Sequence, residues 1–488
     1  MYEDRILSKE LREKIVTASE AAALVKSGMV VGTSGFTGVG YPKTVPFEIA
    51  KQNTAAGLTL VCGASVGDEL DGEFARASLV ARRYPFQSNK DLRNRINSGK
   101  TQYVDLHLGD VPKMVADGLL GRVDIAIADC CLINADGSFV PTLSVGATPA
   151  IVAAADRVIL ELNLNHPTSL SGFHDIPSGE PHIEVAGDRV GLAAIVCDVN
   201  KIAAIVINDR AERNPVFAEP DEASAKIAEF ILELLQKELE AGRLKEPVTI
   251  QSGVGAVANA VLEGLKECDL GEMEMYTEVL QDGALSLVES GRIKFASSTA
   301  LSLAKETETR FYDKFDFFKD RIVLRPQDVS NSGAIIRRLG IVAMNTAVEA
   351  DIYGNVNSTH VMGTNIINGI GGSGDFARNG GLSIFMTPSV AKGGNISCIV
   401  PMVSHVDSTE HDVQIIVTEQ GLADLRGLSP KERAAVIIEN CAHPDYKGAL
   451  QSYFETACEL CKNSQTPHDM EKALSWHLRC RDTGTMKE

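Results

Sequence analysis

The stretch Val248-Thr-Ile-Gln-Ser-Gly-Val-Gly-Ala-Val-Ala-Asn259 decides the fold class. Its first residues are β-branched or apolar, as in a buried strand, and Gly253 and Gly255 then lead into an apolar helix. A strand that passes through a glycine turn into a helix is typical of α/β proteins. The first N–H groups of such a helix have no intrahelical acceptor, so the turn can bind an anion or an oxyanion. As an isolated string it also fits an ordinary turn.

A second stretch, Val30-Val-Gly-Thr-Ser-Gly-Phe36, repeats the pattern of a strand that runs into Ser-Gly and is followed by a helix. The repetition suggests two related α/β domains that face each other, although strand-glycine-helix units are common in all α/β folds. Short β-branched runs alternate with amphipathic helices along the whole chain, which predicts largely parallel sheets. The runs expected to form buried strands are 29–33, 58–62, 123–128, 158–162, 202–207, 248–251, 274–278, 293–296, 322–324, 341–345, 383–386 and 413–417.

A polar segment separates the two halves of the chain. Residues 208–221 contain Pro215 and Pro220, and a helix is expected to follow from about residue 222 to residue 244. We therefore predict an N-terminal α/β domain, residues 1–220, and a C-terminal α/β domain, residues 221–488.

Composition excludes several classes of protein. The chain has 488 residues, 44% of them hydrophobic, which is enough to fill the cores of two or three domains. Its formal net charge of −18 disfavours nucleic-acid binding, so an anionic ligand must be held by a local cluster of positive groups. The N-terminus lacks the pattern of a signal peptide, and the most apolar stretch, residues 191–207, contains Asp198 and Lys201. We expect a cytoplasmic protein without a membrane span.

The cysteines and histidines give no pattern of a metal site. The ten cysteines are scattered, as expected for free thiols in a reducing cytosol, and no disulfide is predicted. Cys458 and Cys461 have CxxC spacing but lie in an expected helix without a second pair, which favours helix packing over zinc binding. His405 and His411 flank an acidic run but lack the spacing of a helical metal motif. We assign no metal.

The segment Tyr276-Thr-Glu-Val-Leu-Gln-Asp-Gly283 offers one carboxylate, Glu278, where we expect a strand to end in a turn over residues 281–283. A carboxylate at a strand end is firmly held yet reachable, which suits it to chemistry. A solvated residue at a strand terminus is the simpler interpretation of this segment taken alone.

Two further glycine-rich segments lead to different predictions. The run Gly369-Ile-Gly-Gly-Ser-Gly-Asp-Phe376 has four glycines in six residues, which indicates close approach of the backbone to a ligand or positive φ angles. The run from Gly35 to Gly40 lacks the order of a dinucleotide fingerprint, and Pro42 precedes the next helix. A Rossmann dehydrogenase is therefore disfavoured.

Taken together and in order, these segments resemble class I coenzyme A transferases. The resemblance covers essentially the whole chain, and within that class the chain is similar to the acetyl-CoA hydrolase/transferase group, above all to its succinyl-CoA:acetate CoA-transferases. The stretches that carry the resemblance are 253–261, 276–283, 330–340, 369–376 and 417–427.

The resemblance implies a fold and a mechanism. It implies two open α/β/α domains with the active site between them, and a homodimer. Glu278 would be the nucleophile of a ping-pong reaction between a short-chain acyl-CoA and a carboxylate such as acetate or succinate. The intermediates would be a mixed anhydride and a glutamyl-CoA thioester. Coenzyme A and acyl-CoA would be substrates, with no tightly bound cofactor.

The resemblance also implies roles for individual residues. Asn331 would hydrogen-bond near Glu278, and the backbone N–H groups of Val254 and Gly372 would stabilise oxyanions. Arg213 would bind the substrate carboxylate, or else be an ordinary surface arginine. The residues expected to contact coenzyme A are Gly253, Val254, Gly255, Ala256, Val257, Asn368, Gly372 and Lys392.

Three alternatives remain open at this point. A hydrolase would use water to resolve the glutamyl intermediate, and exclusion of water from the cleft cannot be judged from sequence. A transferase could use propionate or butyrate as its acid. A coenzyme A-binding subunit without activity is disfavoured, because Glu278, Asn331 and both glycine turns are present.

Overall fold

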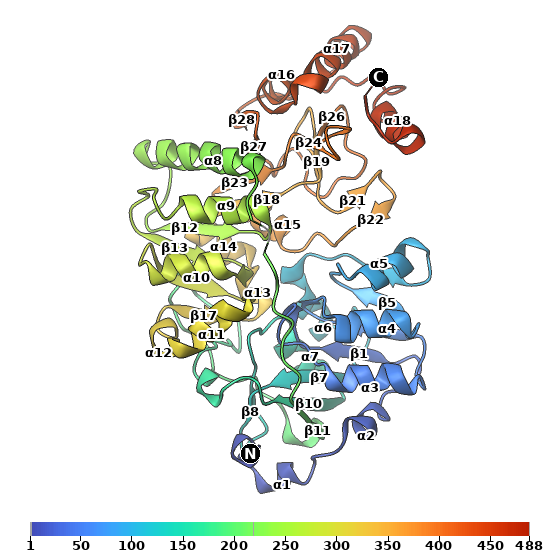
Figure 1. Ribbon diagram of the computed structural model, residues 1–488, viewed down its shortest axis with the longest axis vertical. Coiled ribbons are helices and arrows are strands. Elements are labelled where there is room, and N and C mark those ends of the chain that lie inside the picture. Colours follow the sequence, from blue (N-terminus) through green and yellow to red (C-terminus); the bar gives the residue numbers. More distant parts are fainter. Residues whose placement is uncertain (1, 218, 488) are drawn as a thin grey trace. The chain divides into compact units, whose positions relative to one another are not determined.

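The computed structural model describes residues 2–217 and 219–487 (Figure 1). Its contacts divide the chain into two compact units. The first unit comprises Met1–Val216, Met275–Val288 and Lys294–Arg338, and the second comprises Phe217–Glu274, Glu289–Ile293 and Leu339–Glu488. The segment that contains Glu278 therefore groups with the N-terminal residues, although it follows residue 220 in the sequence. The expected domain division at residue 220 stays a prediction.

The first unit contains a seven-stranded parallel sheet in the order β11-β10-β7-β1-β3-β5-β6. The inner strand β7 is buried along its whole length, which is characteristic of parallel sheets covered by helices on both faces. The strand order reverses at β1, and ligands in such sheets bind at the carboxyl ends beside that reversal. The strands are β1 (Val30–Thr33), β3 (Leu58–Val61), β5 (Val80–Tyr84), β6 (Gln102–Tyr103), β7 (Ile125–Cys130), β10 (Arg157–Asn163) and β11 (Ile202–Asn208).

Helices and short strands complete this part of the first unit. The cluster around Val31, Leu60 and Ile127 packs the sheet against α2 and α3. Ser34-Gly35 leads into a short strand, β2, before α3 begins, so the first copy of the repeated pattern is less direct than expected. The elements are α1 (Lys9–Arg12), α2 (Ala18–Ala22), β2 (Phe36–Thr37), α3 (Thr44–Gln52), β4 (Ala64–Ser65), α4 (Glu73–Arg76), α5 (Lys90–Asn97), a 3-10 turn (Leu108–Asp110), α6 (Val111–Ala116), β8 (Leu132–Ile133), β9 (Phe139–Val140) and α7 (Thr148–Ala154).

The elements from β13 to α14 lie mostly in the first unit, and Glu278 lies in the bend between two of them. Strand β14 pairs in parallel with β16, and β15 pairs in parallel with β17. The strand before Glu278 ends at Tyr276, two residues earlier than expected, and Asp282-Gly283 begins a helix where a turn was expected. The Asp282 carboxylate accepts hydrogen bonds from Ala304 N and Thr307 Oγ1. The elements are β13 (Met273–Tyr276), β14 (Val279–Leu280), α10 (Asp282–Glu289), β15 (Ile293–Ser298), β16 (Ala300–Leu301), α11 (Lys305–Asp313), α12 (Phe315–Phe318), β17 (Ile322–Leu324), α13 (Gln327–Ser330) and α14 (Gly333–Leu339).

In the second unit β12, β18, β23, β27 and β28 are neighbours in that order. The first four strands are mutually parallel, and β28 returns antiparallel to β27. Strand β12 passes through the glycine turn directly into α9, as the sequence predicts. The strands are β12 (Val248–Ser252), β18 (Val342–Thr346), β23 (Leu382–Met386), β27 (Ile415–Thr418) and β28 (Gly421–Asp424).

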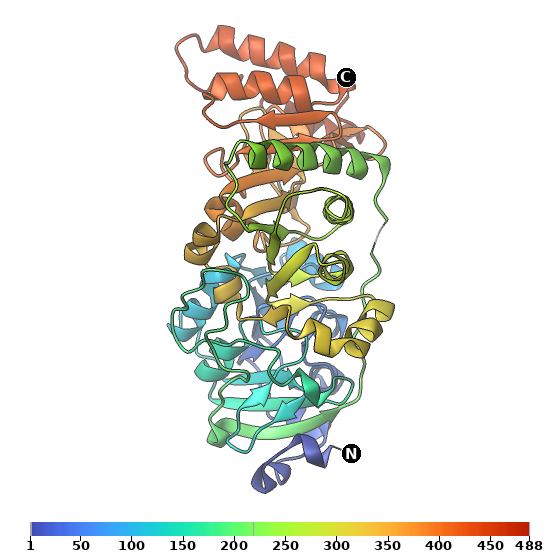
Figure 2. The same ribbon diagram turned by 90° about the vertical axis from the view of Figure 1, so that its left-hand side faces the viewer.

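Helices and hairpins cover this second sheet. Helix α8 ends at Glu240 instead of near residue 244, because Gly242 adopts a φ of 66° just beyond its end. Helices α16 and α17 lie side by side (Figure 2). The elements are α8 (Glu222–Glu240), α9 (Ala256–Gly264), β19 (Glu349–Asp351), β20 (Val356–Asn357), β21 (His360–Val361), β22 (Asn365–Ile366), α15 (Ser373–Asn379), β24 (Val390–Ala391), β25 (Ile396–Ser397), β26 (Ile399–Val400), α16 (Pro430–Cys441), α17 (Pro444–Leu460) and α18 (Ser475–Thr483). Among the described residues, no helix has the length and apolar character that crossing a bilayer requires.

Candidate active site

Glu278 lies in a bend between β13 and β14 and is half-buried. Its carbonyl oxygen accepts hydrogen bonds from Thr299 N and Ala300 N, both at 3.0 Å, and from Ser298 Oγ at 2.7 Å. Ser298 is fully buried, so this clamp is shielded from water. The backbone of Glu278 is therefore fixed where the regular strand has ended.

The side-chain amide of Asn331 holds the carboxylate of Glu278. Asn331 Nδ2 donates to Glu278 Oε1 at 2.6 Å, and Asn331 Oδ1 accepts from Ser330 Oγ at 2.8 Å. The second bond fixes the orientation of the amide, because it uses the oxygen as acceptor and leaves the nitrogen as donor. Asn331 is only 2% exposed, and a hydrogen bond to a carboxylate is stronger than one between neutral groups. The structure thus brings the predicted pair together.

Two features that the sequence analysis missed set the position of this pair. The buried Tyr276 hydroxyl donates to the Val329 carbonyl at 2.6 Å, and each of these residues lies two positions before a member of the pair. Gly109 supports Asn331 from another side, since a Cβ at residue 109 would lie 2.8 Å from the carbonyl oxygen of Asn331. The sequence Leu-Gly-Asp does not indicate this role of Gly109. A glycine is required there only because the distant residue Asn331 packs against it.

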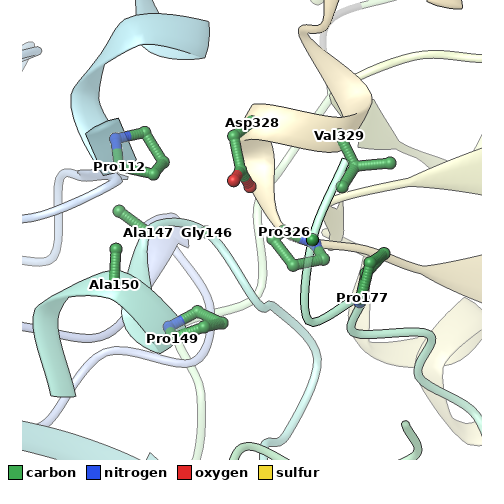
Figure 3. Close-up of a pocket in the computed structure, with 10 residues that line it drawn as sticks. Pro112, Gly146, Ala147, Pro149, Ala150, Pro177, Pro326, Asp328 and Val329 are labelled. Carbon is green, nitrogen blue, oxygen red and sulfur yellow. The ribbon is translucent and has the colours of Figure 1, made fainter. Parts of the chain in front are cut away.

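A small pocket adjoins α13 within the first unit (Figure 3). Four proline rings, those of Pro112, Pro149, Pro177 and Pro326, contribute to its wall together with Asp328. Its volume of about 50 Å³ accommodates water molecules but not an acyl group with its coenzyme. The pocket is therefore too small to be the whole binding site of an acyl-CoA.

The residues expected to contact coenzyme A and the oxyanion lie in the second unit. Gly255 precedes the first residue of α9 with a φ of 116°, and Val254 before it is 53% exposed. Gly372 stands at the same position before α15, after Gly371 with a φ of 60°. Both expected turns therefore present backbone N–H groups at a helix N-terminus, where anions are favoured.

The two polar side chains expected to contact coenzyme A, those of Asn368 and Lys392, differ in their surroundings. Asn368 Nδ2 donates to the carbonyl oxygens of Ser358 and Gly369, at 3.2 and 2.8 Å. Lys392 is exposed at the tip of the β24–β25 hairpin, with a φ of 48°. Within the described part of the chain its ammonium group forms no ion pair, so it is available to an anionic ligand.

Arg213 is already engaged by carboxylates. Its Nε lies 2.7 Å from Glu69 Oε1, and its Nη1 lies 3.3 Å from Asp68 Oδ2. The preceding residue, Glu212, is paired with the fully buried Lys43 at 3.1 Å. Burial opposes ionisation of Glu212, but the charges and hydrogen bonds of Lys43 and His166 together lower the pKa of that carboxyl. Binding of a substrate carboxylate by Arg213 stays a prediction, and it requires exchange of these partners.

The two histidines considered as metal ligands contact different residues. His405 stacks on His360, with ring centroids 3.8 Å apart, and its Nε2 lies 3.3 Å from Asp407 Oδ1. His411 Nδ1 contacts Thr409 Oγ1 instead, at 3.4 Å. In the described ranges, no group of three or more His, Cys, Asp or Glu side chains is arranged to hold a metal ion.

The arrangement around Glu278 suits a nucleophilic carboxylate. One carboxylate oxygen is hydrogen-bonded and the backbone is fixed, so the group is oriented before a substrate arrives. Comparison with known proteins identifies the family of the chain. Residues 2–207 match the model of the acetyl-CoA hydrolase/transferase N-terminal domain, and residues 308–454 match the model of its C-terminal domain. The chain belongs to the acetyl-CoA hydrolase/transferase family.

Full-length relatives of this family member include both transferases and hydrolases. It is 48% identical to the succinyl-CoA:acetate CoA-transferase of Clostridium kluyveri, with 99% of this chain and 92% of the relative covered. It is 41% identical to the acetyl-CoA hydrolase of Candida albicans, with 97% and 96% covered. The crystal structure of RipA from Yersinia pestis shares the fold, with a TM-score of 0.71 and 23% identity over 91% of this chain and 97% of RipA. These matches confirm the resemblance found from the sequence.

Proposed function

We propose that this family member is a CoA-transferase that moves coenzyme A between succinyl-CoA or acetyl-CoA and acetate or succinate. The observation that carries the proposal is the Glu278 carboxylate, oriented by Asn331 at 2.6 Å on a fixed backbone. The similarity to a succinyl-CoA:acetate CoA-transferase supports the choice of acids.

The first half-reaction forms an enzyme-bound thioester in two steps. The Glu278 carboxylate attacks the thioester carbonyl of the acyl-CoA, so that a mixed anhydride forms and coenzyme A leaves as the thiolate. The thiolate then attacks the glutamyl carbonyl of the anhydride. This attack forms a glutamyl-CoA thioester and releases the first acid as its carboxylate.

The second half-reaction reverses these steps with another acid. The incoming carboxylate attacks the glutamyl-CoA carbonyl and expels the thiolate, which then attacks the new acyl carbonyl and regenerates Glu278. The bond energy is kept in thioester and anhydride throughout. Because the first acid leaves before the second binds, the kinetics are ping-pong.

Backbone N–H groups stabilise the oxyanions in this proposal. The N–H groups of Val254 and Gly372 belong to the two helix-capping turns, which favour negative charge. Removal of one oxyanion donor lowers rates about 10²–10³-fold in enzymes that have been tested. Residues 253–257, Asn368 and Lys392 bind coenzyme A in this scheme, and Lys392 supplies positive charge in an otherwise acidic protein.

A hydrolase is the second candidate function. The specific observation in its favour is the 41% identity to an acetyl-CoA hydrolase over nearly the whole chain. In a hydrolase, water instead of a carboxylate attacks the glutamyl intermediate, with the same Glu278 chemistry before that point.

Thiol release separates the two functions. Acetyl-CoA alone should give no sustained release of free thiol, whereas acetyl-CoA with succinate should give succinyl-CoA and acetate without free thiol. Sustained thiol release that is independent of the acceptor acid would show a hydrolase instead. Glu278→Ala should abolish either activity and retain the far-UV spectrum of the folded protein, which identifies any contaminating thioesterase.

A further inference from the structure

The turn that carries Lys392 has an unusual backbone. Lys392, Gly393 and Gly394 have φ angles of 48°, 64° and 85°, so three successive residues adopt the left-handed region. Lysine rarely adopts this conformation, and it persists only where surrounding contacts impose it. The two strands of the hairpin, β24 and β25, contribute two residues each, too few to be stable alone. Other parts of the chain must therefore fix the turn.

The C-terminal tail, residues 485–487, supplies such contacts. Met486 N donates to the Asn395 carbonyl at 2.8 Å, and Thr485 Oγ1 donates to the same oxygen at 3.2 Å. Asn395 follows the three left-handed residues directly. The tail is thus hydrogen-bonded to the end of the turn, about 90 residues away in sequence.

The side chain of Met486 anchors the tail in the core. It is 1% exposed and belongs to the same buried cluster as Tyr446 and Trp476, against which Val390 and Ile396 of the hairpin also pack. Tyr446 adds a direct bond, since its hydroxyl donates to the Gly394 carbonyl at 2.9 Å. The tail and the hairpin therefore share one apolar support.

We propose that Thr485 and Met486 are positioning residues that hold the Lys392 turn so that its ammonium group meets the phosphate groups of acyl-CoA. The inference rests on the proposed function, in which Lys392 contacts coenzyme A. A lysine side chain is long and flexible, so a fixed backbone reduces the entropy that is lost on binding. The tail then determines affinity for acyl-CoA without touching the reacting atoms.

Steady-state kinetics with acetyl-CoA and succinate test this proposal in three variants: Lys392→Ala, Met486→Ala and a chain that ends at Gly484. Each should raise the KM for acetyl-CoA, by about fivefold to tenfold for the loss of a charged hydrogen bond. Turnover at saturation should change little, because the lost contact is the same in ground and transition states. The KM for succinate should also be unchanged.

A double-mutant cycle gives the decisive comparison. Lys392→Ala combined with either tail variant should raise the KM no further than Lys392→Ala alone, because the tail acts through that lysine. Additive effects would overturn the proposal. Met486→Ala is the milder tail variant and keeps the test usable if the shortened chain does not fold.

Two controls separate the possible failures. Arg426→Gln removes an ion pair to Glu238 elsewhere in the second unit, and it should lower thermal stability with an unchanged KM. A rise in KM in this control equal to that of the tail variants would overturn a specific role of the tail. If Lys392→Ala raises the KM but the tail variants do not, only the inference fails. If Lys392→Ala has no effect, the contact with coenzyme A in the proposed function fails as well.

Discussion

Asn331 Nδ2 lies 2.6 Å from Glu278 Oε1, and this hydrogen bond joins residues that are 53 positions apart in the chain. A parallel bond, from the Tyr276 hydroxyl to the Val329 carbonyl, lies two residues earlier on both segments. The two bonds together fix β13 and its following bend against α13. The Glu278 carboxylate is therefore oriented by contacts between distant segments of the chain.

Asn331→Asp tests the hydrogen bond with almost no change in shape. Two carboxylates would then share one site, and the pKa of one of them would rise. We expect transfer at neutral pH to fall by about 10²-fold or more, as on loss of a positioned donor. Activity should recover partly at lower pH, because the introduced carboxyl group, once protonated, can again donate to Glu278. A pH–rate profile measures this, with the exposed Asn94→Asp as control. An unchanged profile would contradict the assigned role.

Tyr276→Phe tests the second bond. Removal of the hydroxyl leaves the Val329 carbonyl without this donor and loosens α13, so turnover should fall about tenfold. Tyr103→Phe is a matched control, since Tyr103 also donates to a backbone carbonyl, that of Pro85, at 2.6 Å in the same unit. Both variants should lose about 1 kcal/mol of stability by chemical denaturation. If their turnover falls equally, Tyr276 has a general structural role only.

The stability of the second unit should depend on the ionisation of Glu238. This carboxylate is 2% exposed, and hydrogen bonds from Arg243 and Arg426 lower its pKa from 4.5 to about 2. Because the folded pKa lies below the ordinary value, the stabilisation is complete above pH 4.5 and is lost as the pH falls towards 2. Glu238→Gln should cost about 2 kcal/mol at neutral pH, the scale of a charged hydrogen bond.

The loss in Glu238→Gln should shrink on acidification, which urea unfolding at decreasing pH can follow. Glu229→Gln, at an exposed position of the same helix, should change the free energy of unfolding by less than about 0.5 kcal/mol at every pH. A cost in Glu238→Gln that stays constant down to about pH 3 would show that lost packing, and not charge, is responsible.

Much of the fold could be predicted from the sequence because parallel strands buried on both faces appear as short apolar runs. β7 and β18 are examples, and both occur within two residues of the predicted ranges. β5 was missed, since Arg82 and Arg83 interrupt its apolar pattern. Arg83 is nevertheless fully buried, because it pairs with Asp71. The sequence near Arg83 does not indicate that this partner exists.

Only the part of the candidate site that lies in local sequence motifs could be predicted. Glu278 was singled out from its own segment and Asn331 by resemblance, and their contact is a finding of the structure. The supports of the pair, Ser298 and Gly109, could not be predicted, because they act through backbone contacts between distant segments. The same holds for the tail that supports the Lys392 turn.

Trapping of the covalent intermediate tests the central claim most directly. The protein is incubated with acetyl-CoA without an acceptor acid, treated with borohydride, digested and mapped by mass spectrometry. A glutamyl-CoA thioester is reduced to an alcohol, whereas a free carboxylate is not, so only the protein treated with acetyl-CoA should be inactivated. The account predicts that the change maps to Glu278 within residues 276–283. A modification on a cysteine such as Cys268 or Cys398, with Glu278 unchanged, would contradict it.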